Sequence, residues 1–118
     1  MRAATLLLLL ASVVLADDEK RIKEMYPPVP FAQVADGKFK RPRATIEGTV
    51  KAVRNEADGD VHIELVDGDK LVVLEIIPEL KIDPPKKGDR IRARGIVRED
   101  GWHGWWELHP LVSWEKAK

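Results

Sequence analysis

Three histidines, His62, His103 and His109, are the side chains of this 118-residue chain best suited to chemistry. Imidazole is the commonest metal ligand in proteins, and it titrates near neutral pH. Glu75 and Glu107 are the carboxylates that the expected strands bring close to histidines. A zinc ion takes about four nitrogen, oxygen or sulfur ligands at ~2 Å. The candidate metal ligands are therefore His62, Glu75, Glu107 and His109.

Strand spacing limits which of these residues can share an ion. His103 and His109 are placed six residues apart on one expected strand, roughly 20 Å at ~3.3 Å per residue, so they cannot meet. His62 and Glu75 face each other across a hairpin, where Cβ atoms lie about 5 Å apart. Glu107 and His109 share one strand face, and the two pairs converge if the third and fifth strands are neighbours. The alternative is a hydrogen-bonded His–Glu pair, so we expect no cofactor, with Zn²⁺ as the exception.

Other catalytic chemistry has little support in the sequence. The chain has no Cys, and no Gly-x-Ser-x-Gly segment surrounds either serine. A nucleophilic serine would need such a turn, and a phosphate-binding loop would need a glycine-rich motif that is also absent. The sequence therefore favours a non-enzymatic protein, with a metal-dependent hydrolase that uses the His/Glu pairs as an alternative.

A candidate binding surface lies on the last hairpin, residues 88–114. Asp100-Gly101 is a strong hairpin-turn signal, and a two-residue loop there places Arg94 opposite Glu107. One face then carries the following polar and aromatic residues: Arg92, Arg94, Arg98, His103, Trp105, Glu107 and His109. Arginine for phosphate and tryptophan for base stacking are typical of single-strand nucleic-acid binders. Cross-strand ion pairing is the alternative for the arginines.

The same register predicts the opposite face of the hairpin. Gly95 lies opposite Trp106, and we expect Trp106 to be buried there, with the apolar side chains of Ile63, Leu65, Val72, Leu74, Ile91 and Leu108 nearby. Large residues opposite small ones suit a curved barrel wall.

An earlier hairpin is predicted from residues 61–67 and 70–77 around Asp67-Gly68-Asp69. An even loop pairs residues whose numbers sum to 137, which sets Ile63 opposite Leu74 and His62 opposite Glu75. This register separates polar from apolar faces, which a shift by one residue would mix. A first strand over 43–54 precedes it, with Gly48 as a point of close approach, and residues 78–87 form a connector with one helical turn.

Five strands in this order resemble an OB-fold barrel, an all-β fold. The Gly48-Thr49-Val50 segment and the Gly88-Asp89-Arg90-Ile91 segment with Gly95 carry the resemblance. An SH3-like barrel is the alternative. We assign residues 41–118 to the barrel and residues 17–40 to a short N-terminal extension that packs weakly.

Residues 1–16 have the pattern of a signal peptide, with a positive start, an apolar region and small residues before the expected cleavage after Ala16. This predicts export to the periplasm or outside the cell, with no transmembrane segment once the leader is removed. Retention as an anchor is the alternative. The net charge is 0, and it becomes −1 without Arg2, so a generic polyanion binder is excluded and nucleic-acid binding needs a local patch.

Residues 58–112 also resemble a group of small exported bacterial proteins. The shared segments are Asp58-x-Asp60-x-His62, Glu75-x-x-Pro78, His103-Gly104 and Glu107-Leu108-His109-Pro110-Leu111. The chain departs from the group in Leu111, where Val is usual, and in a shorter stretch before Glu107. The resemblance implies an OB-like barrel and no particular activity. We therefore predict an exported binding module for an unidentified ligand, with single-stranded nucleic acid or a protein as the candidate partner.

Overall fold

The computed structural model describes residues 20–118, so the expected signal peptide, residues 1–16, lies outside the described residues. Residues 20–25 are helical. The elements that follow are α2 (Phe31–Ala35), β1 (Arg43–Asn55), β2 (Val61–Asp67), β3 (Lys70–Ile76), the short 3₁₀ helix η1 (Pro78–Leu80), β4 (Arg90–Asp100) and β5 (Trp105–Lys116). Among the described residues, no helix has the length and apolar character needed to cross a lipid bilayer.

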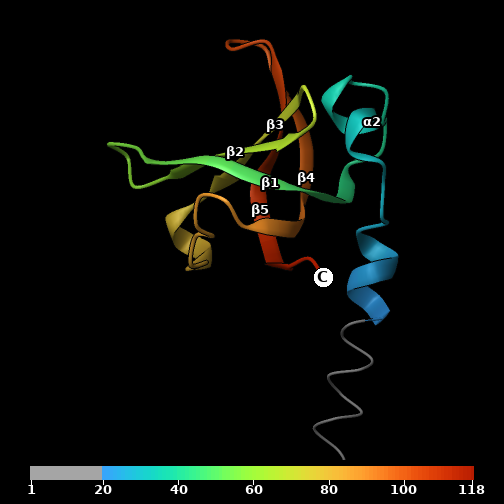
Figure 1. The fold of residues 1–118 in the computed structure, drawn as a ribbon, viewed down its shortest axis with the longest axis horizontal. Helices are drawn as coiled ribbons and strands as arrows, with labels where there is room; N and C mark the ends of the chain where they lie inside the picture. Colours follow the sequence, from blue (N-terminus) through green and yellow to red (C-terminus); the bar gives the residue numbers. More distant parts are fainter. Residues whose placement is uncertain (1–19) are drawn as a thin grey trace, which may run out of the picture.

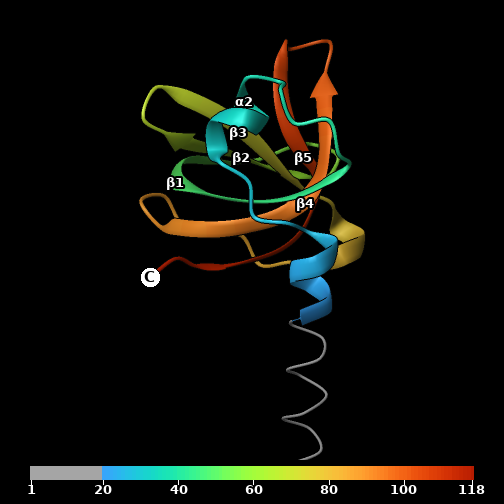
Figure 2. The ribbon, with the colours of Figure 1, turned by 90° about the vertical axis from the view of Figure 1, so that its right-hand side faces the viewer.

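The five strands close into one barrel in the order β1-β2-β3-β5-β4 (Figure 1). All neighbouring pairs are antiparallel except β3 and β5, which run parallel. This order confirms the predicted OB-fold class rather than the SH3-like alternative. In Figures 1 and 2 the β4–β5 ribbon extends beyond the barrel on the side where α2 lies.

The β2–β3 hairpin has the predicted register. Val61 pairs with Ile76, His62 with Glu75 and Ile63 with Leu74, so the pair numbers sum to 137 as expected. The inward face is fully buried and is formed by Ile63, Leu65, Val72 and Leu74. The register follows from burial, because a shift by one residue would turn this apolar face outward.

The predicted register of the β4–β5 hairpin is wrong. Asp100 pairs with Trp105 and Arg98 with Glu107, four residues away from the predicted partners, and the turn contains four residues, 101–104. The Asp100 carboxylate accepts hydrogen bonds from the backbone N–H groups of Trp102 and His103, at 3.0 and 3.2 Å. Gly104 supplies the positive φ of 75° that closes the turn. This side-chain capping of a longer turn replaces the expected two-residue Asp100-Gly101 loop.

The new register also corrects the predicted burial of Trp106. Gly95 lies opposite Leu111, and β-bulges flank it on both sides. Trp106 lies opposite Glu99 and is only half-buried. Its indole packs so closely on Gly37 that a Cβ there would come within 2.5 Å of Nε1. The other predicted members of the core, including Ile91 and Leu108, are fully buried.

The N-terminal extension packs more closely than expected. Phe31 and Val34 of α2 are buried members of the barrel core. Gly48 in β1 is the predicted point of close approach, since an added Cβ would lie 2.8 Å from Leu65 Cγ. The helix therefore closes one end of the barrel and is part of its hydrophobic core.

Candidate functional site: a groove over a histidine–glutamate cluster

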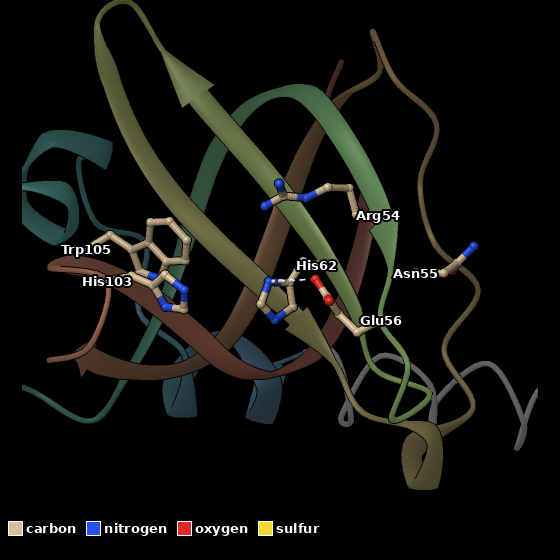
Figure 3. Close-up of a pocket in the computed structure, with 6 residues that line it drawn as sticks. All are labelled: Arg54, Asn55, Glu56, His62, His103 and Trp105. Atoms are coloured by element: carbon tan, nitrogen blue, oxygen red, sulfur yellow. Dashed lines mark ion pairs between the residues drawn. The ribbon is translucent and has the colours of Figure 1, made fainter.

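An open groove of about 640 Å³ lies between the turn that joins β1 to β2 and the turn that joins β4 to β5. We call it the groove; its lining residues are Arg54, Asn55, Glu56, His62, His103 and Trp105. Figure 3 shows the rings of His103 and Trp105 on one side, with Arg54, His62 and Glu56 across from them.

The aromatic side of the groove is a preformed stack. The rings of His103 and Trp105 are 4.2 Å apart between centroids and inclined by only 3°. Asp100 orients the histidine, because its Oδ2 lies 2.8 Å from His103 Nδ1. This contact is the largest cause that lowers the pKa of Asp100. Trp102, at the tip of the turn, is 91% exposed, which is unusual for so large an apolar side chain.

Beneath the groove, four side chains form what we call the His–Glu cluster: His62, Glu75, Glu107 and His109. His62 Nε2 lies 3.0 Å from Glu75 Oε1. His109 Nδ1 lies 3.0 Å from Glu75 Oε2 and 3.2 Å from Glu107 Oε1. The predicted convergence of the His62–Glu75 pair with the Glu107–His109 pair is therefore confirmed.

Strand pairing explains this convergence. His62 and Glu75 are direct partners across β2 and β3. The parallel pairing of β3 with β5 sets Val73 beside Glu107, which brings Glu107 and His109 next to Glu75. Three strands thus contribute side chains to one place on the barrel wall. His103 is not among them, because it lies in the turn and lines the groove.

The carboxylates of the cluster are buried. Glu107 is completely buried and Glu75 nearly so. Trp105 Nε1 donates a hydrogen bond to Glu107 Oε2 at 3.3 Å, and Arg98 Nη2 lies 3.3 Å from Glu107 Oε1. Burial, and then the neighbouring carboxyl group of Asp60, raise the pKa of Glu75, while His109 and His62 act in the opposite direction.

The predicted arginine surface is divided between two places. Arg98 contacts the cluster, whereas Arg92 and Arg94 lie at the other end of β4, where both contact Glu115 Oε1, at 3.2 and 2.8 Å. There they line what we call the cationic hollow, together with Ile22, Lys23, Ser113, Trp114, Glu115, Lys116 and Lys118. Arg94 Nε is buried there without a hydrogen-bond partner among the described residues. The predicted Arg94–Glu107 pair is replaced by Arg98–Glu107.

Several residues of the site were not among the predicted ones. Arg54, Asn55 and Glu56 line the groove from the end of β1, and Asp60 faces Glu75. The signal that identifies them is positional, because OB-fold barrels bind ligands with the loops that follow strands one and four.

No protein-family model and no curated protein matches the chain. Solved structures match its fold. A chain of the Stn1–Ten1 complex of Schizosaccharomyces pombe superposes with a TM-score of 0.56 at 18% identity, over 78% of this chain and 76% of that one. The telomere capping protein Ten1 from the same organism gives a TM-score of 0.54 at 18% identity, over 78% and 81% of the two chains.

Aminoacyl-tRNA synthetases match as well, over part of their length. The asparaginyl-tRNA synthetase of Pyrococcus horikoshii has a TM-score of 0.61 at 14% identity, over 80% of this chain and 24% of that one. The chain thus spans about a quarter of that enzyme. At these identities the likeness concerns the fold: the chain is an all-β, five-stranded closed barrel with OB-fold neighbours.

Proposed function

We propose that the chain is a binding module that holds single-stranded nucleic acid in the groove. The observation that carries this proposal is the parallel His103–Trp105 stack, 4.2 Å between centroids, beside the exposed Trp102. Bases stack on such aromatic faces with little regard to sequence, at roughly 1–3 kcal/mol per base. A preformed platform also avoids part of the entropy cost of ordering side chains on binding.

The position of the groove supports the proposal. OB-fold barrels bind oligonucleotides and oligosaccharides over strands two and three, between the loops that follow strands one and four. Here those loops are residues 56–60 and 101–104, and His62 of β2 lies between them. The names of the structural neighbours, a telomere capping protein and tRNA synthetases, fit a nucleic-acid ligand.

The local charges set the expected mode of binding. Among the described residues, Arg54 is the arginine that lines the groove and Arg98 contacts Glu107 beneath it, whereas Glu56 lines the groove and Asp100 contacts His103 at its edge. Few phosphates can therefore be neutralised, and the chain as a whole has no net charge. Because the salt dependence of affinity follows the number of neutralised phosphates, we expect stacking to dominate and the salt dependence to be shallow.

Fluorescence anisotropy with labelled single-stranded DNA and RNA of about 12 nucleotides tests the proposal, since one OB fold covers ~4–16 nucleotides. We expect Trp105→Ala to weaken binding by about 1–3 kcal/mol and Trp102→Ala to weaken it by less. Trp102 is exposed, so its replacement leaves the fold intact, and a urea titration of each variant checks this.

Arg92→Ala is the matched control, because Arg92 lines the cationic hollow and not the groove. We expect this variant to bind as the wild type does. Absence of binding at ~50 mM salt, where charge interactions are little screened, would end the nucleic-acid proposal. Binding that survives both Trp changes but is lost in Arg92→Ala would move the site to the cationic hollow.

A further inference from the structure

We propose that the His–Glu cluster binds one divalent transition-metal ion of the Zn²⁺ class, with Glu75, Glu107 and His109 as ligands and His62 as the fourth. This inference goes beyond the nucleic-acid proposal and does not depend on it. It rests on the geometry of the four side chains, on their charge and burial, and on the groups that surround them.

The ligand atoms are already close to the arrangement that an ion requires. One ligand atom each from Glu75, Glu107 and His109 lies within 4.8 Å of the others. His109 Nδ1 is 3.0 Å from Glu75 and 3.2 Å from Glu107. Ligands ~2 Å from a tetrahedral ion are about 3.3 Å from each other. For these three ligands an ion would therefore need only small side-chain shifts, whereas His62 lies outside this mutually close group and would have to move toward the ion.

Hydrogen bonding alone serves this arrangement poorly. His109 Nδ1 lies between oxygens of two different carboxylates. A neutral imidazole carries at most one proton on that nitrogen, so the two oxygens must share it. A cation at this point would instead be bound by both oxygens and by the nitrogen at once. Mixed imidazole and carboxylate ligands suit zinc and its neighbours among the transition metals.

The charge of the region also favours a cation. Glu107 is completely buried and Glu75 nearly so, and Asp60 adds a third carboxyl group. Among the described residues, Arg98 is the arginine that contacts Glu107, and its side chain is 55% exposed. Buried carboxylates are costly unless they are paired or bound to a metal. His62, His109 and Trp105 also contact these carboxylates, but a divalent ion would supply a compensating charge that one exposed guanidinium supplies only in part.

The surroundings of the ligands resemble an outer coordination shell. His62 would use Nε2, and its other ring nitrogen, Nδ1, lies 3.4 Å from Glu56 Oε1. Trp105 Nε1 donates to Glu107 Oε2, which holds that carboxylate in place. A metal-bound histidine usually donates its second N–H to a carboxylate or carbonyl, and ligating carboxylates are in turn hydrogen-bonded. His62 also lines the groove, so the ion would be reached from solvent.

Isothermal titration of the untagged chain, treated with EDTA and dialysed, with Zn²⁺ and separately with Mg²⁺ tests the proposal in the absence of nucleic acid. We expect saturable binding of one Zn²⁺ per chain and much weaker binding of Mg²⁺, which prefers oxygen ligands. Titration with Co²⁺ adds a direct readout, because a site of low coordination number gives visible absorption bands.

Two histidine variants locate the site, and the third histidine is the control. We expect His109→Gln and His62→Gln to lower Zn²⁺ affinity at least about 10-fold to 100-fold. Both side chains are partly exposed, at 22% and 16%, so these variants can fold even if a change at the buried Glu107 cannot. His103→Gln should bind Zn²⁺ as the wild type does, because His103 contacts Asp100 and lies outside the cluster.

Either of two results would overturn the metal site: no saturable Zn²⁺ or Co²⁺ binding by the folded wild type, or equal affinity in wild type and His109→Gln. A His103→Gln variant that loses as much affinity as His109→Gln would also overturn it, since the ion would then be held by exposed histidines. These results leave the nucleic-acid proposal unaffected, because that assay follows oligonucleotide binding to the groove.

Discussion

The two halves of the β4–β5 ribbon use the same residue types in opposite ways. In the half next to β1, Arg92 and Arg94 contact Glu115, whose side chain is 50% exposed. In the half near the turn, Arg98 contacts Glu107, which is completely buried. In the first half two arginines share the solvated carboxylate of Glu115, and Arg92 also contacts Glu47 at 2.7 Å. In the second half one exposed arginine contacts a carboxylate that has no access to water.

This difference separates an ordinary surface from a functional candidate. Exposed ion pairs contribute about 0–1 kcal/mol, so Arg92 and Glu115 need no further role than modest stabilisation. Arg94 is buried, and its contact with Glu115 at 2.8 Å gives its charge a partner. A buried carboxylate costs stability unless its environment compensates it. Glu107 lies beside Glu75 and two histidines, where such a cost is typical of functional sites. The comparison therefore points to the half near the turn.

The largest expected change in the free energy of unfolding concerns Leu108, the buried apolar residue that packs the half of the ribbon near the turn into the core. Leu108 is completely buried and follows Glu107 in β5, where it pairs with Leu74 and Val97. Leu108→Ala should lower the free energy of unfolding by about 2–5 kcal/mol, from lost burial and a cavity. Urea denaturation measures it. Leu80→Ala is the control, because Leu80 is exposed; equal losses would show that the half near the turn is not anchored in the core.

The next largest change in stability is expected at the boundary between the two halves of the ribbon, where β-bulges flank Gly95. An added Cβ would lie 2.7 Å from the Pro110 carbonyl oxygen and 2.8 Å from Leu108 Cβ. Gly95→Ala should therefore destabilise the fold by about 1–3 kcal/mol through overpacking. Gly101→Ala is the matched control, since nothing lies within 4 Å of its added Cβ. Equal urea midpoints for the two variants would mean that the bulge tolerates a side chain and does not fix the register.

The contrast between the two hairpins shows what sequence can predict. The register of β2–β3 follows from alternation, because it sets apolar residues such as Ile63 and Leu74 opposite each other on one face and His62 opposite Glu75 on the other. In β4–β5 the true register differs from the predicted one by four residues near the turn, and by six at Arg94, beyond the bulges at Gly95. A shift by an even number keeps every side chain on its face, so alternation could not distinguish the two. The side-chain cap by Asp100 and the bulges at Gly95 decided it.

The candidate site was also predictable only in part. The meeting of the His62–Glu75 pair with Glu107 and His109 was foreseen on the condition that the third and fifth strands are neighbours. The parallel register that sets Val73 beside Glu107 came only from the structure. The groove was not foreseen, because Arg54 and His103 lie in or beside turns whose shape depends on local hydrogen bonds. The division of the arginines also depends on the register, so it could be seen only in the structure.

The smallest expected effect concerns the half of the ribbon next to β1. Arg94, and then Arg92, lower the pKa of Glu115 below its ordinary value of 4.5. A carboxyl group whose pKa is depressed by folding contributes stability above its unfolded pKa and loses it as the pH falls through the folded value. Because the Glu115 side chain is 50% exposed, solvent screening limits the contribution to less than about 1 kcal/mol.

Urea denaturation of wild type and Glu115→Gln from about pH 7 to pH 3 measures this contribution, since the range spans the ordinary carboxyl pKa. The wild type should be slightly more stable at pH 7, and the difference should disappear toward pH 3 and shrink in ~1 M salt, where the Debye length is ~3 Å. Glu79→Gln is the control, because Glu79 is exposed and has no ion pair among the described residues. A difference that persists at pH 3 would mean that Glu115 acts through packing. A loss at pH 7 far above ~1 kcal/mol would show that this half, too, holds a costly carboxylate, and the contrast between the halves would fail.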